Sequence, residues 1–132
     1  AKAVIAAGAD YEQVKAIGDK AVDRFGRVDT WVHAAATGLF STFDRITPEE
    51  FKRVVEVDFM GQVYGAMVAL PLLKKEGRGS FVSITSVEAR RSLPYQSPYS
   101  ASKHGVMGML DSLRLELKHQ GYPINVANIM PG

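Results

Sequence analysis

Residues 79–132 read GSFVSITSVEARRSLPYQSPYSASKHGVMGMLDSLRLELKHQGYPINVANIMPG, a stretch in which two apolar runs of strand length enclose a long helical pattern. The two predicted strands cover residues 80–85 and 124–130. The helix between them is expected to begin at Ser97-Pro98, a capping residue followed by proline, and to end before Gly121. A strand, a helix and a second strand in this order predict two parallel strands with a right-handed helical crossover.

The same alternation continues upstream. Strands are predicted at residues 4–7 and 29–35, and a helix capped by Asp10 should end near Phe25. Thr47-Pro48-Glu49-Glu50 has the residue types of a capping box and predicts a helix to about Lys75. The chain is therefore expected to be a single α/β domain over residues 1–132, a partial doubly wound parallel sheet of order β-α-β-α-β-α-β. Ligands of such sheets bind beyond the carboxyl ends of the strands.

Composition excludes several classes of protein. The chain has 132 residues, 46% hydrophobic and 23% charged, and its net charge is +2 without a cluster of Lys or Arg, so no nucleic-acid partner is expected. The longest uncharged stretch, residues 59–73, is shorter than the roughly 20 residues of a membrane span, so no membrane partner is expected. The chain has no cysteine, which excludes a disulfide scaffold and a thiol nucleophile and agrees with a cytoplasmic location.

Tyr99 and Lys103 form a Y-x-x-x-K pattern, whose spacing places both side chains on one helical face. A nearby ammonium favours the phenolate, so the pKa of Tyr99 is expected to fall below the usual value of about 10, which suits a general acid or base. Tyr11 and Lys15 share this spacing, but no strand and serine of the same kind precede them, so they are interpreted as solvated helix residues. Ser86 follows a predicted strand and should emerge at the same sheet edge as Tyr99. It either hydrogen-bonds a substrate oxygen or caps a turn.

Residues 79–132, together with residues 25–65, resemble the short-chain dehydrogenase/reductase family, and the resemblance covers essentially the whole chain. It implies a Rossmann-like fold, NAD or NADP as cofactor, and a small-molecule alcohol or ketone as substrate. Tyr99 would exchange the proton, Lys103 would lower the pKa of Tyr99 and hold the nicotinamide ribose, and Ser86 would position the substrate oxygen. The cofactor-binding residues implied are Ala34, Ala35, Ala36, Tyr99, Lys103, Pro131 and Gly132.

The chain departs from the family at three places. The family usually has Asn-Asn-Ala-Gly where this chain has His33-Ala34-Ala35-Ala36, and His33 is interpreted as structural. An asparagine that anchors a relay water is replaced by Asp58, which is kept in the predicted catalytic set with Ser86, Tyr99 and Lys103. No G-x-x-x-G-x-G loop occurs in the 132 residues.

In the family's strand order 3-2-1-4-5-6, the chain would hold strands 3 to 6. Strand 3 would have no neighbour, and strand 4 would expose the edge that ought to pair with strand 1. The 132 residues alone are therefore expected to be inactive, and poorly stable or self-associating. A homo-oligomer is expected through the helices at residues 48–75 and 98–120, because the first of these is apolar on two sides.

Two other functions are alternatives to an oxidoreductase. A non-catalytic binding or assembly module with the same fold remains open, with Asp58 and His33 as signs of drift. A hydrolase that uses Ser86 is disfavoured, because Ser86 lacks the G-x-S-x-G context of such a nucleophile.

Overall fold

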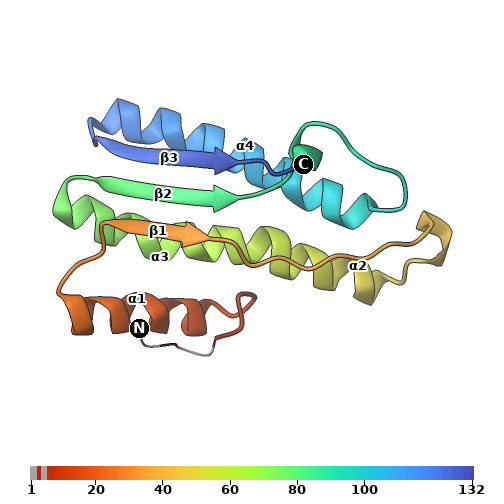
Figure 1. The fold of residues 1–132 in the computed structure, drawn as a ribbon, viewed down its shortest axis with the longest axis horizontal. Helices are drawn as coiled ribbons and strands as arrows, with labels where there is room; N and C mark the ends of the chain where they lie inside the picture. Colours follow the sequence, from red (N-terminus) through yellow and green to blue (C-terminus); the bar gives the residue numbers. More distant parts are fainter. Residues whose placement is uncertain (1–2, 4–5) are drawn as a thin grey trace.

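The computed structural model describes residue 3 and residues 6–132, and these residues form one parallel sheet flanked by helices. The strands are β1 (Thr30–His33), β2 (Gly79–Ile84) and β3 (Ile124–Ile129). They lie in the order β1-β2-β3, so β2 is central (Figure 1). The prediction of a parallel α/β sheet is confirmed.

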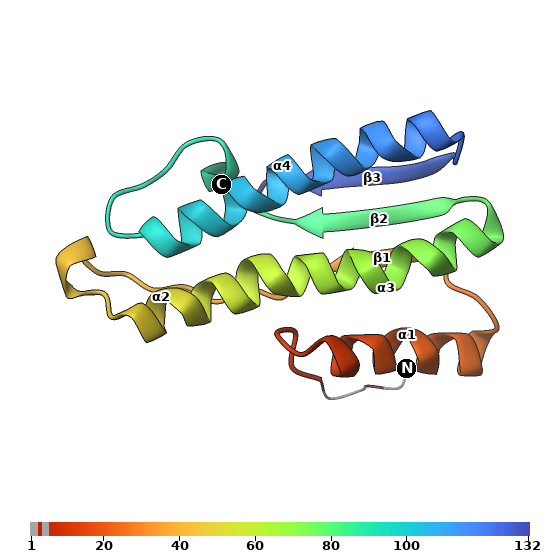
Figure 2. The same ribbon diagram turned by 180° about the vertical axis from the view of Figure 1, so that it is seen from behind.

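Long helices connect the strands. The helical segments are α1 (Tyr11–Phe25), α2 (Pro48–Val55), α3 (Gly61–Glu76) and α4 (Ser97–Gln120), with short turns η1 (Phe43–Arg45) and η3 (Val87–Ala89). In Figure 2, α3 and α4 cover one face of the sheet, and α1 lies beside α3 next to β1. The apolar core lies between the sheet and these helices, where Leu73, Phe81 and Leu110 are completely buried.

The predicted helix over residues 48–75 is one continuous helix with an interruption in its hydrogen-bond pattern. Between α2 and α3, the segment η2 (Glu56–Met60) is π-helical, and the N–H of Gly61 donates to the carbonyl of Glu56. Single π-helical turns inside α-helices occur frequently at functional sites. Asp58 lies in the middle of this turn and is fully buried.

Most helix ends follow the predicted capping. The Asp10 side chain accepts a hydrogen bond from the N–H of Gln13 at 3.0 Å, and Thr47 and Glu50 form the reciprocal bonds of a capping box. Gly26 and Gly121 have φ values of 79° and 76°, a left-handed conformation that glycine adopts without strain.

Two predictions differ from the structure. Ser97 does not cap α4: Gln96 is the capping residue, because its carbonyl accepts the first helical bond, from the N–H of Ser100 at 2.9 Å. Ser97 is therefore already inside the helix. The strand predicted at residues 4–7 falls partly on residues 4 and 5, which lie outside the described residues, while Ala6 and Ala7 are not in a strand.

Candidate active site

Tyr99 and Lys103 occupy the first two turns of α4. The beginning of α4 lies close to the carboxyl end of β2 (Figure 1). Lys103 Nζ lies 5.0 Å from the centroid of the Tyr99 ring, and Lys103 is completely buried while Tyr99 is half-buried. The spacing therefore does place both side chains on one face of the helix. The partial exposure of the phenol leaves it accessible to a small molecule.

Ser86 lies just after β2, in extended backbone at the start of η3. Its Oγ accepts a hydrogen bond from the N–H of Glu88 at 3.1 Å, so the turn-capping interpretation is correct. The Ser86 side chain also interacts with the Tyr99 phenol, where it acts to lower the pKa of Tyr99. The turn-capping use of the hydroxyl is therefore present, and its use toward a substrate oxygen stays a prediction.

Asp58 joins this group from the π-helical turn. Its Oδ1 accepts a hydrogen bond from the N–H of Thr37 at 2.6 Å, and its Oδ2 lies 3.4 Å from Lys103 Nζ. Both charged side chains are completely buried. Burial raises the pKa of Asp58, and the Thr37 N–H and the Lys103 charge oppose that rise.

The pKa of Tyr99 is raised above its usual value, which corrects the expectation that Lys103 would lower it. Burial is the main cause, and the negative charges of Asp58 and Glu88 add to it. The ammonium of Lys103 does not reverse the shift, because its nearest charged neighbour is the Asp58 carboxylate. The phenol therefore faces an ion pair in place of a free cation.

His33, at the end of β1, is buried beneath α3. A Cβ atom added at Gly65 would lie 2.4 Å from His33 Nδ1, so the imidazole occupies space that only a glycine leaves open. Burial, and then the Lys103 charge, lowers the pKa of His33. Its Nε2 has no hydrogen-bond partner among the described residues. The environment is that of a packed side chain, in agreement with the structural interpretation.

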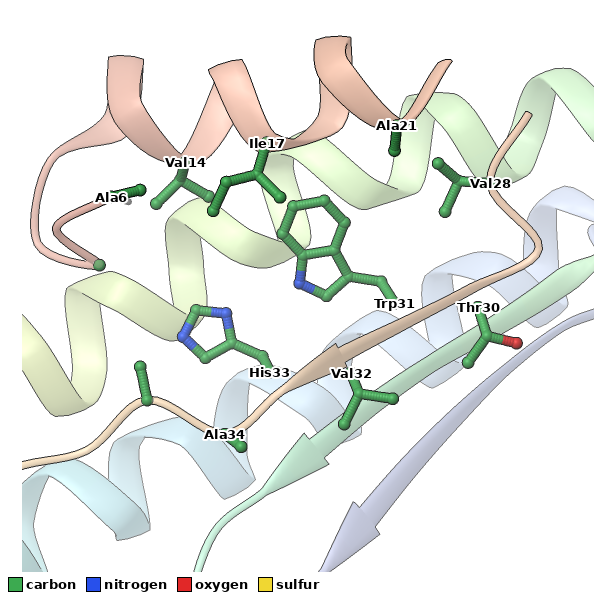
Figure 3. Close-up of a pocket in the computed structure, with 12 residues that line it drawn as sticks. Ala6, Val14, Ile17, Ala21, Val28, Thr30, Trp31, Val32, His33 and Ala34 are labelled. Carbon is green, nitrogen blue, oxygen red and sulfur yellow. The ribbon is translucent and has the colours of Figure 1, made fainter. Parts of the chain in front are cut away.

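The predicted cofactor residues lie around the same edge. Ala34, Ala35 and Ala36 are exposed, and the first two line a cavity of about 400 Å³ between α1 and β1, which His33 and Trp31 also enter (Figure 3). The carbonyl of Pro131 accepts a hydrogen bond from the N–H of Val87 at 3.0 Å. This bond holds Pro131 and the exposed Gly132 beside the loop that carries Ser86.

These residues fit the nicotinamide end of a dinucleotide. Lys103 Nζ is buried and makes no hydrogen bond within the described residues, so the ammonium retains donors for ribose hydroxyls. The methyl side chains of Ala34, Ala35 and Ala36 leave the backbone open to close approach.

Three residues that support the site had no signal in the sequence. Thr37 contributes only its backbone N–H, to Asp58. Glu88 is buried and accepts a hydrogen bond from Ser100 Oγ at 2.6 Å. Gln62 is also buried, and its Oε1 accepts a bond from Ser83 Oγ at 2.9 Å, which connects α3 to β2. Each contact joins residues far apart along the chain.

The second Y-x-x-x-K pair has a different environment. Lys15 forms an exposed ion pair with Asp19 at 2.7 Å, and the Tyr11 ring packs against Tyr64 with 5.7 Å between centroids. Tyr11 and Lys15 are thus surface helix residues, as expected.

Comparisons with known proteins agree with this architecture. The sequence model of the family described as short chain dehydrogenase matches residues 2–132. The uncharacterized oxidoreductase YxnA of Bacillus subtilis is 34% identical over 92% of the chain and 34% of its own length. The chain thus spans about a third of that relative.

Solved structures show the same fold. The crystal structure of levodione reductase has a TM-score of 0.91 and 32% identity, over 98% of the chain and 50% of that protein. An alcohol dehydrogenase from Thermococcus sibiricus, complexed with 5-hydroxy-NADP, has a TM-score of 0.87 and 26% identity, over 96% of the chain and 52% of that protein. The Rossmann-like fold is confirmed. Among the described residues, none of the helices combines the length and the apolarity needed to cross a membrane.

Proposed function

Because the chain belongs to the short-chain dehydrogenase family, we propose that it forms the proton-transfer part of the active site of an NAD(P)-dependent oxidoreductase. The proposed reaction interconverts a secondary alcohol and a ketone. The observation that carries the proposal is the convergence of Ser86, Tyr99 and Lys103 at one edge of the sheet, with Lys103 Nζ 5.0 Å from the Tyr99 ring.

The nicotinamide, when bound, supplies or accepts the hydride. In the direction of reduction, the carbonyl carbon receives this hydride, and the Tyr99 hydroxyl donates its proton to the carbonyl oxygen. In the direction of oxidation, the Tyr99 phenolate accepts the proton of the alcohol. A raised pKa keeps Tyr99 protonated over a wide pH range, which favours its role as the acid in reduction.

Ser86 and Lys103 complete the proposed site. The Ser86 hydroxyl adjoins the Tyr99 phenol and is in place to donate a second hydrogen bond to the same substrate oxygen. The free donors of Lys103 Nζ suit the ribose hydroxyls of the cofactor. Ala34, Ala35, Ala36, Pro131 and Gly132 are proposed to line the nicotinamide side of the site.

Substitution of Tyr99 by phenylalanine tests the function directly. In the full-length protein, Tyr99→Phe is expected to lower turnover of NADH or NADPH with a panel of ketones by about 10²- to 10⁴-fold, because the general acid is lost. Tyr11→Phe is a matched control: it removes the same hydroxyl from the same sequence pattern and is expected to leave turnover unchanged.

The outcomes separate the candidate functions. Turnover that survives Tyr99→Phe would exclude Tyr99 as the acid. Cofactor binding without turnover of any alcohol or ketone would favour the non-catalytic binding module instead.

We also propose that the protein forms a homo-oligomer through the helices at residues 48–75 and 98–120. Support comes from a groove of about 320 Å³ between α3 and α4, which is lined mainly by apolar side chains. Met67 lies in this groove and is 56% exposed, although methionine is usually buried.

A cytoplasmic location stays a prediction, and cell fractionation would test it.

A further inference from the structure

The Asp58–Lys103 pair distinguishes this site from the asparagine-containing sites that the chain resembles. Asp58 is on the π-helical turn and Lys103 is on α4, and Oδ2 and Nζ are 3.4 Å apart. Neither side chain has any exposed surface, and neither of these two atoms has a hydrogen-bond partner among the described residues. At this separation, the Lys103 charge opposes the rise in the pKa of Asp58 that burial causes.

The pair is electrically neutral whenever the two side chains hold one titratable proton between them. This holds for a carboxylate beside an ammonium and equally for a carboxylic acid beside a neutral amine. In either form, the site has one positive charge fewer than the same site with an asparagine at position 58. The conclusion therefore does not depend on which atom holds the proton.

Tyr99 is the group that this missing charge affects most, because Lys103 Nζ lies 5.0 Å from its ring. An unpaired ammonium at this distance would favour the phenolate. Two other ionisable groups of the site do not supply a positive charge: His33 is buried with a lowered pKa, and Glu88 is acidic and bonded to Ser100. Glu56, on the same turn as Asp58, pairs with the exposed Lys52.

We propose that Asp58 is a positioning residue that neutralises Lys103 and thereby moves the pH dependence of the reaction toward alkaline pH. This inference rests on the function proposed above. Oxidation needs the phenolate, so its rate rises only at higher pH. Reduction needs the phenol, so it persists to higher pH. Asp58 thus biases the site toward reduction at neutral pH.

The test is the pH profile of the full-length protein with Asp58→Asn. The profiles of kcat/KM for alcohol oxidation and for ketone reduction should both move toward acid by about one pH unit, because Lys103 then faces Tyr99 as an unpaired cation. Asp19→Asn is the matched control: it also removes a carboxylate from a lysine ion pair, but an exposed one, and should move neither profile.

A second measurement does not depend on turnover. Absorbance titration of tyrosine ionisation, with and without Tyr99→Phe, isolates the Tyr99 phenol in the cofactor-free protein. Its midpoint should fall in Asp58→Asn. Asp58→Ser also removes the charge and should shift the midpoint in the same direction if the asparagine variant does not fold.

The outcomes distinguish this inference from the proposed function. An unchanged Tyr99 midpoint and unchanged profiles in Asp58→Asn overturn the role of Asp58, while loss of turnover in Tyr99→Phe would still support the proposed function. A shifted midpoint in a protein without turnover supports the effect of Asp58 on Tyr99 and counts against the proposed reaction.

Discussion

Ser100 follows Tyr99 in the sequence, and its hydroxyl donates a hydrogen bond to Glu88 Oε2 at 2.6 Å in a buried setting. Ser100 is 3% exposed and Glu88 is 4% exposed, so water cannot readily replace the bond. The bond ties the start of α4 to the loop after β2, and so it holds Tyr99 near Ser86. Loss of this bond should mainly lower the stability of the protein, and it should disturb the position of Tyr99 to a smaller extent.

We therefore expect Ser100→Ala to lower the free energy of unfolding by about 2 kcal/mol, since the Glu88 carboxyl group would remain buried without its donor. Ser41→Ala is the control, because Ser41 Oγ donates to the carbonyl of Thr42 at 3.3 Å in an exposed position and its loss should cost almost nothing. Urea denaturation of the full-length protein measures both. Equal effects of the two substitutions would contradict the buried-bond argument.

For single residues, the sequence predicts that the Tyr99 and Lys103 side chains share one helical face, but it does not predict the direction of the Tyr99 pKa shift. The i,i+4 spacing of Tyr99 and Lys103 is local, so it could be predicted from the chain alone. The raised pKa of Tyr99 comes first from burial and then from charges such as that of Asp58, which lies about forty residues away, and both arise only in the folded protein. Glu88 was missed for the same reason.

Among the helices, Thr47 and Ser97 were both predicted to be capping residues, but only Thr47 caps its helix. Thr47 accepts a hydrogen bond from the N–H of Glu50 at 3.2 Å, whereas Ser97 Oγ is buried and has no hydrogen-bond partner within residues 6–132. Thr47→Ala should lower the free energy of unfolding by about 1 kcal/mol, the usual cost of a lost cap. Ser97→Ala should cause no loss, since it removes a buried hydroxyl that forms no bond. Thermal unfolding of the two variants checks this, and a larger loss from Ser97→Ala would show that Ser97 does act as the cap.

The continuous helix formed by α2, η2 and α3 was predicted correctly at its ends but not in its middle. Its ends follow from the capping box at Thr47 and from Gly77, both of which are short-range signals. The π-helical turn at Glu56–Met60 has no such signal, because α-helical periodicity describes it equally well. We attribute the turn to tertiary contacts, among which the most specific are the hydrogen bond that Asp58 accepts from the N–H of Thr37 and the ion pair of Asp58 with Lys103.

Across the whole molecule, the sheet is covered unevenly. The α3 and α4 helices pack on one face, while no helix within residues 6–132 covers the other, where Val32 is 60% exposed and Ile129 is 47% exposed (Figure 1). Within the same residues, β1 pairs only with β2, and the cavity beside it is largely apolar. These features agree with the prediction that the 132 residues alone associate, because an open strand edge and an exposed apolar face both favour pairing.

Two substitutions test which surface of the chain mediates this association. In the 132-residue chain, Val32→Lys should lower the mass measured by sedimentation velocity, because a charge on an edge strand opposes pairing with another chain. Met67→Lys places the same charge in the groove between α3 and α4 and should weaken the helix-mediated oligomer of the full-length protein instead.

If the open edge of β1 drives association of the 132-residue chain, the mass of that chain responds more to Val32→Lys than to Met67→Lys. A monomer with a cooperative unfolding transition, before any substitution, would contradict the prediction, because it would show that β1 is stable without a second neighbouring strand.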